Sequence, residues 1–234
     1  THATKFRILV TTGVKDSYGN HMSSQWMPME YTTDNSSSGA PLLTEVSGIG
    51  TTSDATPNYI FHSTKSGSIS YGGNCRSSQI HAHSANNTVT FDNLSAGTYS
   101  NCTIKVTDNA TNESNILTVS SFTIDITAPT VDDVSSSTAN GDYFPGDNIT
   151  ITVGFNDTVY VVNSSGNPII QLSARSDNNS YANYVSGNST STLSFLYVVQ
   201  SGDNFSDLDY KATDSFSANG GTIRDNASND ANLT

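Results

Sequence analysis

The stretch Ser120-Ser121-Phe122-Thr123-Ile124-Asp125-Ile126-Thr127-Ala128-Pro129-Thr130-Val131 decides how this chain is organised. Phe122, Ile124 and Ile126 alternate with polar residues, so an extended strand would place all three on one face. Pro129 has no N–H to donate, which ends the pairing of that strand, and a second alternating strand opens at Val131. The stretch therefore predicts a short, rigid joint between two β domains that lie end to end.

Composition indicates polar β structure rather than disorder. The chain has 234 residues, which is enough for one large or two ordinary domains with cores of their own. Only 34% of the residues are hydrophobic, but Tyr, Phe, Val and Ile recur at the period-two spacing of strands. No window of useful length shows the 3.6-residue period of a helix. We therefore expect an all-β protein.

The charge is strongly acidic, with 21 Asp and Glu against 9 Lys and Arg and a net charge of −12. Such a surface repels phosphates, so we expect no nucleic-acid partner. No apolar run approaches the roughly 18 residues of a membrane span, and no signal peptide is recognisable, so we expect no membrane insertion in this segment. Because the chain starts at Thr1 without Met, we expect a processed product or a piece of a longer protein.

The chain divides into four parts. Residues 1–33 hold one convincing strand, Phe6-Arg7-Ile8-Leu9-Val10, and too few others to close a domain. Residues 34–41 form a polar, turn-rich linker that ends in Pro41. Residues 42–127 and 128–234 each show seven or eight short strands separated by Gly, Asn and Asp turns, and those of the second stretch include strands expected near 148–155, 158–162 and 207–212. We call these two parts the middle block and the C-terminal block.

Cysteine and asparagine usage point to an oxidising exterior. Cys75 and Cys102, the two cysteines, both lie in the middle block, which favours a disulfide over a metal site and leaves two free thiols as the alternative. Fourteen of the 25 asparagines begin an Asn-X-Ser/Thr sequon, a twofold excess over chance that predicts N-linked glycans, although Asn, Ser and Thr also gather together in β-turns. The sequon positions are Asn35, Asn86, Asn93, Asn101, Asn109, Asn112, Asn148, Asn156, Asn163, Asn178, Asn188, Asn204, Asn226 and Asn232.

Several motifs, in the right order, resemble the tandem prokaryotic Ig-like repeats of surface-layer and adhesin-type proteins. They are Val10 to Asp16 with the Gly19-Asn20 turn, the Tyr71 to Cys75 and Gly97 to Ile104 segments, Thr127 to Val131, Gly146 to Val153, Asp207 to Tyr210 and Asn219 to Asp225. The resemblance implies tandem Ig-like β-sandwich domains joined end to end, with the first one incomplete. It also implies a Cys75–Cys102 disulfide. The missing strands of residues 1–33 would be cut off or supplied by another chain, as in strand complementation.

Catalytic motifs are not found in the sequence. There is no Gly-X-Ser-X-Gly, no His-Glu-X-X-His, no P-loop and no dinucleotide fingerprint, so we do not expect an enzyme. His81 and His83 would share one strand face near His62, but we expect an exposed polar face rather than a zinc site.

Calcium is the better-motivated ion, because oxygen ligands from Asp, Asn and carbonyl groups suit Ca²⁺ and arrays of sandwich domains often stiffen their joints with it. Acids in β-turns are more often simply solvated, so each single ligand is a hypothesis. The candidate ligands are Asp108, Asp125, Asp132, Asp157, Asp207, Asp209 and Asp225, with Asp133 and Asp203 beside them.

These features predict an extracellular, cell-surface structural segment of a surface-layer, filament or adhesin-type protein, which acts in assembly and surface coating. Its expected partners are other copies of itself or neighbouring repeats. The alternative is an adhesive or carbohydrate-binding module that recognises a host or neighbouring cell. Trp26, the single tryptophan, could serve a carbohydrate platform, although capping the core of the incomplete first part is the simpler interpretation.

Overall fold

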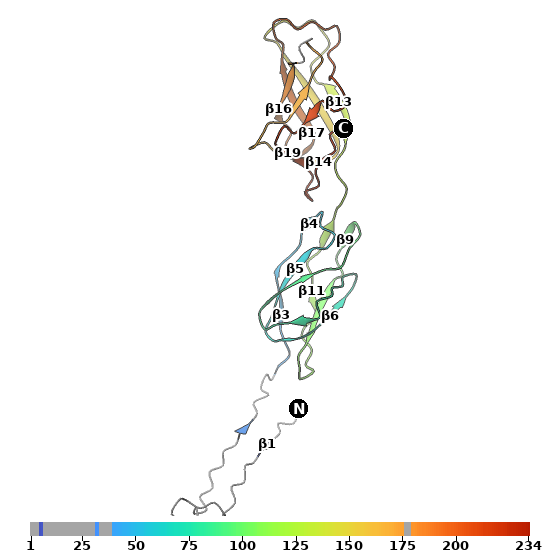
Figure 1. Cartoon of the computed structure of the whole chain (residues 1–234). Coiled ribbons are helices and arrows are strands. Elements are labelled where there is room, and N and C mark those ends of the chain that lie inside the picture. The colour runs from blue at the N-terminus through green and yellow to red at the C-terminus, as the bar shows by residue number, and fades with distance from the viewer. Residues whose placement is uncertain (1–4, 7–30, 33–38, 176–178) are drawn as a thin grey trace, which may run out of the picture.

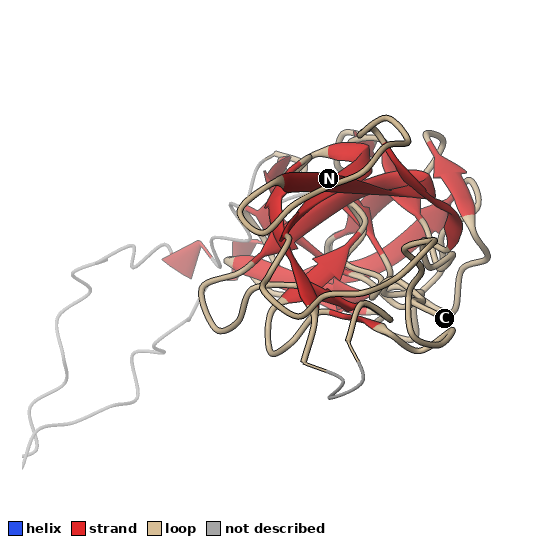
Figure 2. Ribbon diagram, turned by 90° about the horizontal axis from the view of Figure 1, so that it is seen from above, coloured by secondary structure: helices blue, strands red, loops and turns tan. Residues whose placement is uncertain are grey.

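The computed structural model describes residues 5–6, 31–32, 39–175 and 179–234. Every regular element in these ranges is a β strand, as the absence of helical ribbon in Figure 2 shows, so the all-β prediction is confirmed. Consequently, the described residues include no helix with the length and apolarity that a bilayer crossing needs. Most of residues 1–38, Trp26 and Asn35 among them, lie outside the described ranges.

The N-terminal part contributes one described pair of strands. β1 (Lys5–Phe6) pairs antiparallel with β2 (Tyr31–Thr32). Figure 1 places this pair below the middle block, at the opposite end of the molecule from the C-terminal block.

The middle block contains three small sheets. The first has the strand order β3 (Leu43–Ser47), β5 (Asn58–Ser63), β8 (Asn86–Thr90). The second has the order β11 (Leu117–Thr118), β10 (Thr103–Thr107), β6 (Gly67–Gly72), β7 (His81–Ala82). The third has the order β4 (Thr51–Thr52), β12 (Phe122–Ile124), β9 (Gly97–Tyr99), in which β4 and β12 run parallel.

Alternation along these strands builds the core of the middle block. In β5 the side chains of Tyr59 and Phe61 are fully buried, and in β10 those of Ile104 and Val106 are. The disulfide predicted between the two cysteines is confirmed: Cys75 and Cys102 are bonded, with a Cα–Cα distance of 5.3 Å, inside the same hydrophobic cluster. It joins the loop after β6 to the start of β10.

β12 closes this core and contains the stretch that predicted the joint. Phe122 and Ile124 are 2% and 1% exposed. The Phe122 ring stacks on Tyr99 at a centroid distance of 5.2 Å and on Phe91 at 6.1 Å. Ile126, the third residue of the predicted face, is 55% exposed because the strand has ended by then.

The C-terminal block is built on one curled sheet of seven strands. Its order is β13 (Val131–Ser136), β14 (Asn148–Val162), β17 (Thr190–Val198), β16 (Tyr181–Ser186), β15 (Ile169–Gln171), β18 (Phe216–Ser217), and β19 (Thr222–Arg224) pairs with β14 off this path. The strands expected at 148–155 and 158–162 form one continuous element, β14. Its register shifts between Gly154 and Val159, where its partner changes from β17 to β19. The strand expected at 207–212 is reduced to one bridge, Leu172 to Tyr210.

Two separate clusters of buried side chains therefore lie one after the other along the chain. The first contains residues from Leu43 to Ile124 and the second residues from Ile149 to Ile223. In Figure 1 the blue-to-green middle block and the yellow-to-red C-terminal block follow one another along the long axis of the molecule. The short segment between β12 and β13 connects them.

Removing the Phe122 ring should destabilise the middle block strongly. Phe122→Ala leaves a cavity beside the rings of Phe91 and Tyr99, and such truncations cost about 3–5 kcal/mol of unfolding free energy. Ile126→Ala, four residues later and exposed, is the matched control and should change stability by less than about 0.5 kcal/mol. Urea unfolding monitored by circular dichroism measures both variants. Equal effects would mean that β12 is not part of the core.

Candidate functional site

Three carboxylates gather where the two blocks meet. One carboxylate oxygen from each of Asp125, Asp157 and Asp225 lies within 4.8 Å of the other two. Asp225 is 5% exposed, Asp125 is half-buried and Asp157 is exposed. All three were among the predicted calcium ligands, and the fold brings them together from positions 100 residues apart in the chain.

Each member of this acidic cluster is positioned by the end or the irregularity of a strand. Asp125 follows β12 directly and so comes from the middle block. Asp157 lies in β14 inside the register shift, where the backbone changes partners and the side chain is released from the ladder. Asp225 follows β19 directly. The cluster therefore contains one acid from the middle block and two from the C-terminal block.

Asp225 begins a five-residue turn, Asp225-Asn226-Ala227-Ser228-Asn229, which also bridges the two blocks. Its carboxylate accepts hydrogen bonds from the backbone N–H of Asn229 at 2.8 Å and from the Nδ2 of Asn229 at 2.7 Å. The same Nδ2 donates to the main-chain oxygen of Asp125 at 2.8 Å. In addition, the N–H of Ser53 in the middle block donates to the carbonyl of Ala227 at 3.0 Å. These bonds hold the C-terminal block against the end of β12 and the end of β4.

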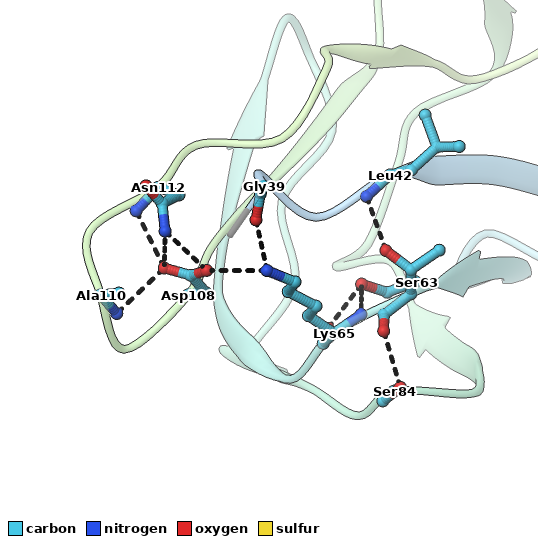
Figure 3. A network of polar contacts seen from close by, with 9 residues as sticks. Gly39, Leu42, Ser63, Lys65, Ser84, Asp108, Ala110 and Asn112 are labelled. Carbon is cyan, nitrogen blue, oxygen red and sulfur yellow. Dashed lines mark hydrogen bonds and ion pairs between the residues drawn. The ribbon is translucent and has the colours of Figure 1, made fainter. Parts of the chain in front are cut away.

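The middle block contains the same turn at its own far end, Asp108-Asn109-Ala110-Thr111-Asn112. Asp108 Oδ1 accepts from the N–H groups of Ala110 and Asn112, both at 2.9 Å, and the Asn112 side chain donates to the Asp108 carboxylate, as Figure 3 shows. The fourth residue has a positive φ in both turns, 66° at Thr111 and 73° at Ser228. Because a residue other than glycine adopts this conformation at a cost, highest for the β-branched Thr111, the capping bonds must hold it there.

The two turns face different charges. In the middle block the ammonium of Lys65 lies 3.7 Å from Asp108 Oδ2 and donates to the main-chain oxygen of Gly39, two residues before Pro41 (Figure 3). At the joint the corresponding turn faces Asp157 and Asp125. A cation therefore occupies one site, and carboxylates occupy the other.

Strand registers show that Lys65 and Asp157 hold equivalent positions. Ser63 pairs with Leu43, the first residue of β3, and Phe155 pairs with Val131, the first residue of β13. Lys65 comes two residues after Ser63, and Asp157 comes two residues after Phe155. Ser68 pairs with Thr107, the residue before the first turn, and Tyr160 pairs with Arg224, the residue before the second turn. Ser68 comes three residues after Lys65, and Tyr160 comes three residues after Asp157. Both registers align Lys65 with Asp157. The Ala-Pro pairs 40–41 and 128–129 correspond in the same way.

This arrangement can hold a divalent cation. Three carboxylates of formal charge −3 converge, whereas the equivalent position in the middle block provides its own positive charge from Lys65. Ca²⁺ takes six to eight oxygen ligands, and Asp125, Asp157 and Asp225 would supply carboxylate oxygens to it. Bound there, the ion would neutralise like charges and attach the end of the middle block to the start of the C-terminal block.

The other predicted ligands lie elsewhere. Asp108 lies in its turn near Gly39, where the chain enters the middle block, and not in the acidic cluster at the joint. Asp132 is exposed on β13, and Asp207 and Asp209 are exposed on the loop before Tyr210. Within the described ranges, the three histidines at 62, 81 and 83 are not brought together with other possible ligands into a metal-binding group.

Most sequon asparagines of the described ranges are exposed and accessible to a glycosyl transfer enzyme. Asn112 differs because its Nδ2, the atom to which an N-linked glycan is attached, donates to both oxygens of Asp108 at 3.2 and 3.0 Å. A glycan on Asn112 would leave Nδ2 with a single hydrogen and so weaken its bonding to the Asp108 carboxylate, while the backbone bonds of the turn would not involve the modified atom. Asn178 lies outside the described residues.

The equivalence of the two turns was not identified from the sequence, although the sequence contains a signal for it. The motif Asp-Asn-Ala-(Thr or Ser)-Asn occurs at 108–112 and again at 225–229, at the same place relative to the preceding strand. Aligning the two blocks on this motif would have shown that the turns correspond. The correspondence of Lys65 with Asp157 needs the strand registers, because the two residues lie at different distances in sequence from their Ala-Pro pairs and from their turns.

Acid should destabilise the middle block through Asp108. Hydrogen bonds from the Asn112 side chain and backbone, with the nearby Lys65 ammonium, hold the pKa of Asp108 below its usual value. A lowered folded-state pKa stabilises the fold above the unfolded pKa of about 3.9, and this stabilisation is lost as pH falls through the folded pKa.

The Asp108→Asn variant tests this linkage. It should melt a few degrees below the wild type at pH 7, and the difference should begin to shrink as the pH falls below about 4, the unfolded pKa, and disappear only below the lowered folded-state pKa of Asp108. Asp92→Asn, an exposed acid of the same block, is the control and should melt like the wild type throughout. A difference between Asp108→Asn and the wild type that does not change with pH would contradict the role of the carboxylate charge.

Comparison with known proteins adds no assignment to this geometry. No protein-family model matches the chain. No curated protein matches it either.

Proposed function

We propose that the chain is an extracellular structural segment, made of tandem Ig-like β-sandwich blocks, of a surface-layer, filament or adhesin-type assembly. The observation that supports this best is the repeated construction at the start of each block. An Ala-Pro pair leads into the first strand, and an Asp-capped turn of the same block packs beside it. A chain that repeats this construction extends in one direction with a defined geometry at each joint.

The blocks are built to resist extension and attack. Each block has a closed cluster of buried side chains, and the middle block is cross-linked by its disulfide. Across the joint, hydrogen bonds from Ser53 and Asn229 join backbone atoms of the two blocks in addition to the covalent chain. These features support a role in reach and stiffness.

The surface also supports an exterior location. Eleven sequon asparagines of the described ranges are exposed, and the chain has a net charge of −12. Glycans and carboxylates together hydrate a surface and keep it from adhering to unrelated molecules. The exposed sequon positions are Asn86, Asn93, Asn101, Asn109, Asn148, Asn156, Asn163, Asn188, Asn204, Asn226 and Asn232.

We propose that calcium binds at the joint, on the acidic cluster of Asp125, Asp157 and Asp225. The ion would lock the two blocks in one relative orientation, because its ligands come from both. A ligand that binds only the folded state at a concentration about a hundredfold above its Kd stabilises that state by about 2.7 kcal/mol. The C-terminal block, which supplies two of the three acids, should benefit most.

Calcium removal should lower the melting temperature of the C-terminal block by several degrees. The measurement is differential scanning calorimetry of the full chain in excess EGTA and in about 10 mM CaCl₂, a concentration suited to the weak sites of extracellular modules. Magnesium at the same concentration should have a smaller effect, since Mg²⁺ dehydrates reluctantly and demands octahedral geometry. Identical melting in EGTA and calcium would exclude the site.

Asp157→Lys gives a sharper test, because it copies the residue that the middle block has at the equivalent position. The lysine should place an ammonium near Asp225, as Lys65 does near Asp108, and make the joint independent of calcium while it keeps the stability of the calcium-bound wild type within about 1 kcal/mol. Asp132→Lys, an exposed change of the same charge on the neighbouring strand, should keep the calcium response. A calcium response that survives in Asp157→Lys would place the ion elsewhere.

The structural role itself is tested on native cell envelopes. Electron cryotomography should show the protein, labelled by an antibody to the middle block, in a regular array or filament. If the label is instead scattered and a glycan array gives a strong specific signal, the adhesive alternative replaces the structural one. A blank glycan array is expected.

A further inference from the structure

An open cleft of about 830 Å³ runs along the C-terminal block. Its two walls are the segment from Val134 to Phe144 and the segment from Asp203 to Tyr210, and apolar side chains of β14, β15 and the end of β17 form its floor. A smaller hollow of about 170 Å³ shares Val134, Ile170 and Tyr210 with it. The two together follow β13 along its length.

The equivalent place in the middle block is filled by a strand. There β12 lies between β4 and β9 and pairs with both. In the chain order, β4 lies between β3 and β5, and residues 137–147 lie in the same way between β13 and β14. Likewise, β9 lies between β8 and β10, and residues 199–221 lie between β17 and β19. The two walls of the cleft therefore correspond to β4 and β9. Among the described residues of the C-terminal block, no strand lies between them.

The middle block also shows what such a slot accepts. β12 presents Phe122 and Ile124 to the core at alternate positions, and both are almost fully buried. In the C-terminal block the apolar floor that would receive their equivalents includes Ile149, Ile151 and Val199. The slot thus fits an extended segment with a large apolar residue at every second position.

The walls of the cleft carry acidic side chains, which would favour a positively charged segment. Asp142, Asp203, Asp207 and Asp209 all line it. Asp203 Oδ1 is buried and accepts no hydrogen bond from the described residues, although the Nε of Arg175 lies 3.9 Å away as an ion pair. An incoming strand with cationic side chains would be attracted to these four acids.

The sequence contains a segment with both properties, Lys5-Phe6-Arg7-Ile8-Leu9-Val10. Its Phe6, Ile8 and Val10 repeat the spacing of Phe122, Ile124 and Ile126, while Lys5 and Arg7 fall on the other face of an extended strand. Residues 1–15 contain three of the nine Lys and Arg residues and no acid, within a chain of net charge −12. This basic, alternating segment complements the acidic cleft.

In Figure 1 β1 lies below the middle block and β13 above it, so Lys5 and Phe6 are at the opposite end of the molecule from the cleft of their own chain. We propose that Lys5–Val10 of one copy of this chain inserts as a strand into the C-terminal cleft of a second copy, in the place that β12 fills in the middle block. Because the two surfaces differ, the contact is heterologous and each added copy offers a free cleft again, so the copies form an open filament. The inference deepens the proposed structural role and rests on it.

Charge reversal on the full chain tests the pairing. Sedimentation velocity at about 1–100 µM should show concentration-dependent oligomers of the wild type. Lys5→Glu with Arg7→Glu, or Asp207→Lys with Asp209→Lys, should weaken the association at least tenfold, and the variant with all four substitutions should regain it. Asp92→Lys with Glu113→Lys, exposed positions of the middle block, makes the same change in charge as the cleft pair and should associate like the wild type.

A labelled synthetic peptide of residues 1–15 reports on the cleft directly. By fluorescence anisotropy it should bind the full chain, lose affinity as salt rises to about 0.5 M, and bind the Asp207→Lys, Asp209→Lys variant at least tenfold more weakly. A matching peptide with glutamate at positions 5 and 7 should not bind. Calorimetry of each variant confirms that the block is folded when binding is measured.

The inference is overturned if the wild type remains monomeric at 100 µM and the peptide does not bind, or if the fourfold variant fails to regain association while folded. A monomeric chain that is nevertheless found in a regular array on native envelopes would overturn this contact and leave the structural role standing. Scattered labelling with a positive glycan array would overturn the structural role instead. These experiments therefore separate the two failures.

Discussion

The structure depends on an aspartate that caps a five-residue turn with its own carboxylate. Asp108 and Asp225 each accept N–H bonds from the residues that follow them and hold a left-handed Thr or Ser in place. The turn lies beside the first strand of its block, so the same carboxylate that shapes the turn lies close to the residues that lead into the block, through Lys65 at Asp108 and beside Asp125 at Asp225. A local capping interaction thereby fixes a long-range relation, the direction in which one block leaves the other.

The charge that faces this carboxylate differs between the two turns. A carboxylate that is nine-tenths buried, as in Asp225, is costly next to two more acids unless positive charge compensates it. In the middle block the positive charge near Asp108 is the ammonium group of Lys65, a side chain of the same block. At the joint the chain supplies no equivalent lysine, and Asp157 takes the position. Asp108 and Asp225 thus have the same role in the backbone but lie near different charges, an ammonium group at Asp108 and two further carboxylates at Asp225.

Much of the fold could be predicted from the sequence, because period-two alternation records which face of a strand is buried. Phe122 and Ile124 were correctly assigned to one buried face, and Cys75 and Cys102 to one disulfide. The acidic cluster could be predicted only as part of a longer set of acids. Alternation says nothing about which strand ends converge, and Asp157 reaches the cluster through a register shift that no local pattern indicates.

The cleft was beyond sequence reasoning for a related reason. Its walls are loops whose residues are ordinary turn formers, and its meaning comes from comparison with β4, β9 and β12 of the middle block. The loop at 207–212 shows the difficulty: its alternating residues predicted a strand, but a strand there needs a neighbour to pair with, and only Leu172 supplies a bridge. Pairing is a property of two segments, whereas propensity is a property of one.

The exchange of Lys65 for Asp157 has a mechanical consequence. At the start of the middle block, Lys65 supplies the positive charge, whereas at the joint a bound cation would have to supply it. If both kinds of junction occur in every copy, the polymer is not equally flexible along its length. Low external calcium would soften every second junction and leave those between intact, so bending would concentrate at evenly spaced points. Substitution at this single position would then set how an otherwise repetitive fibre yields to changes in salinity.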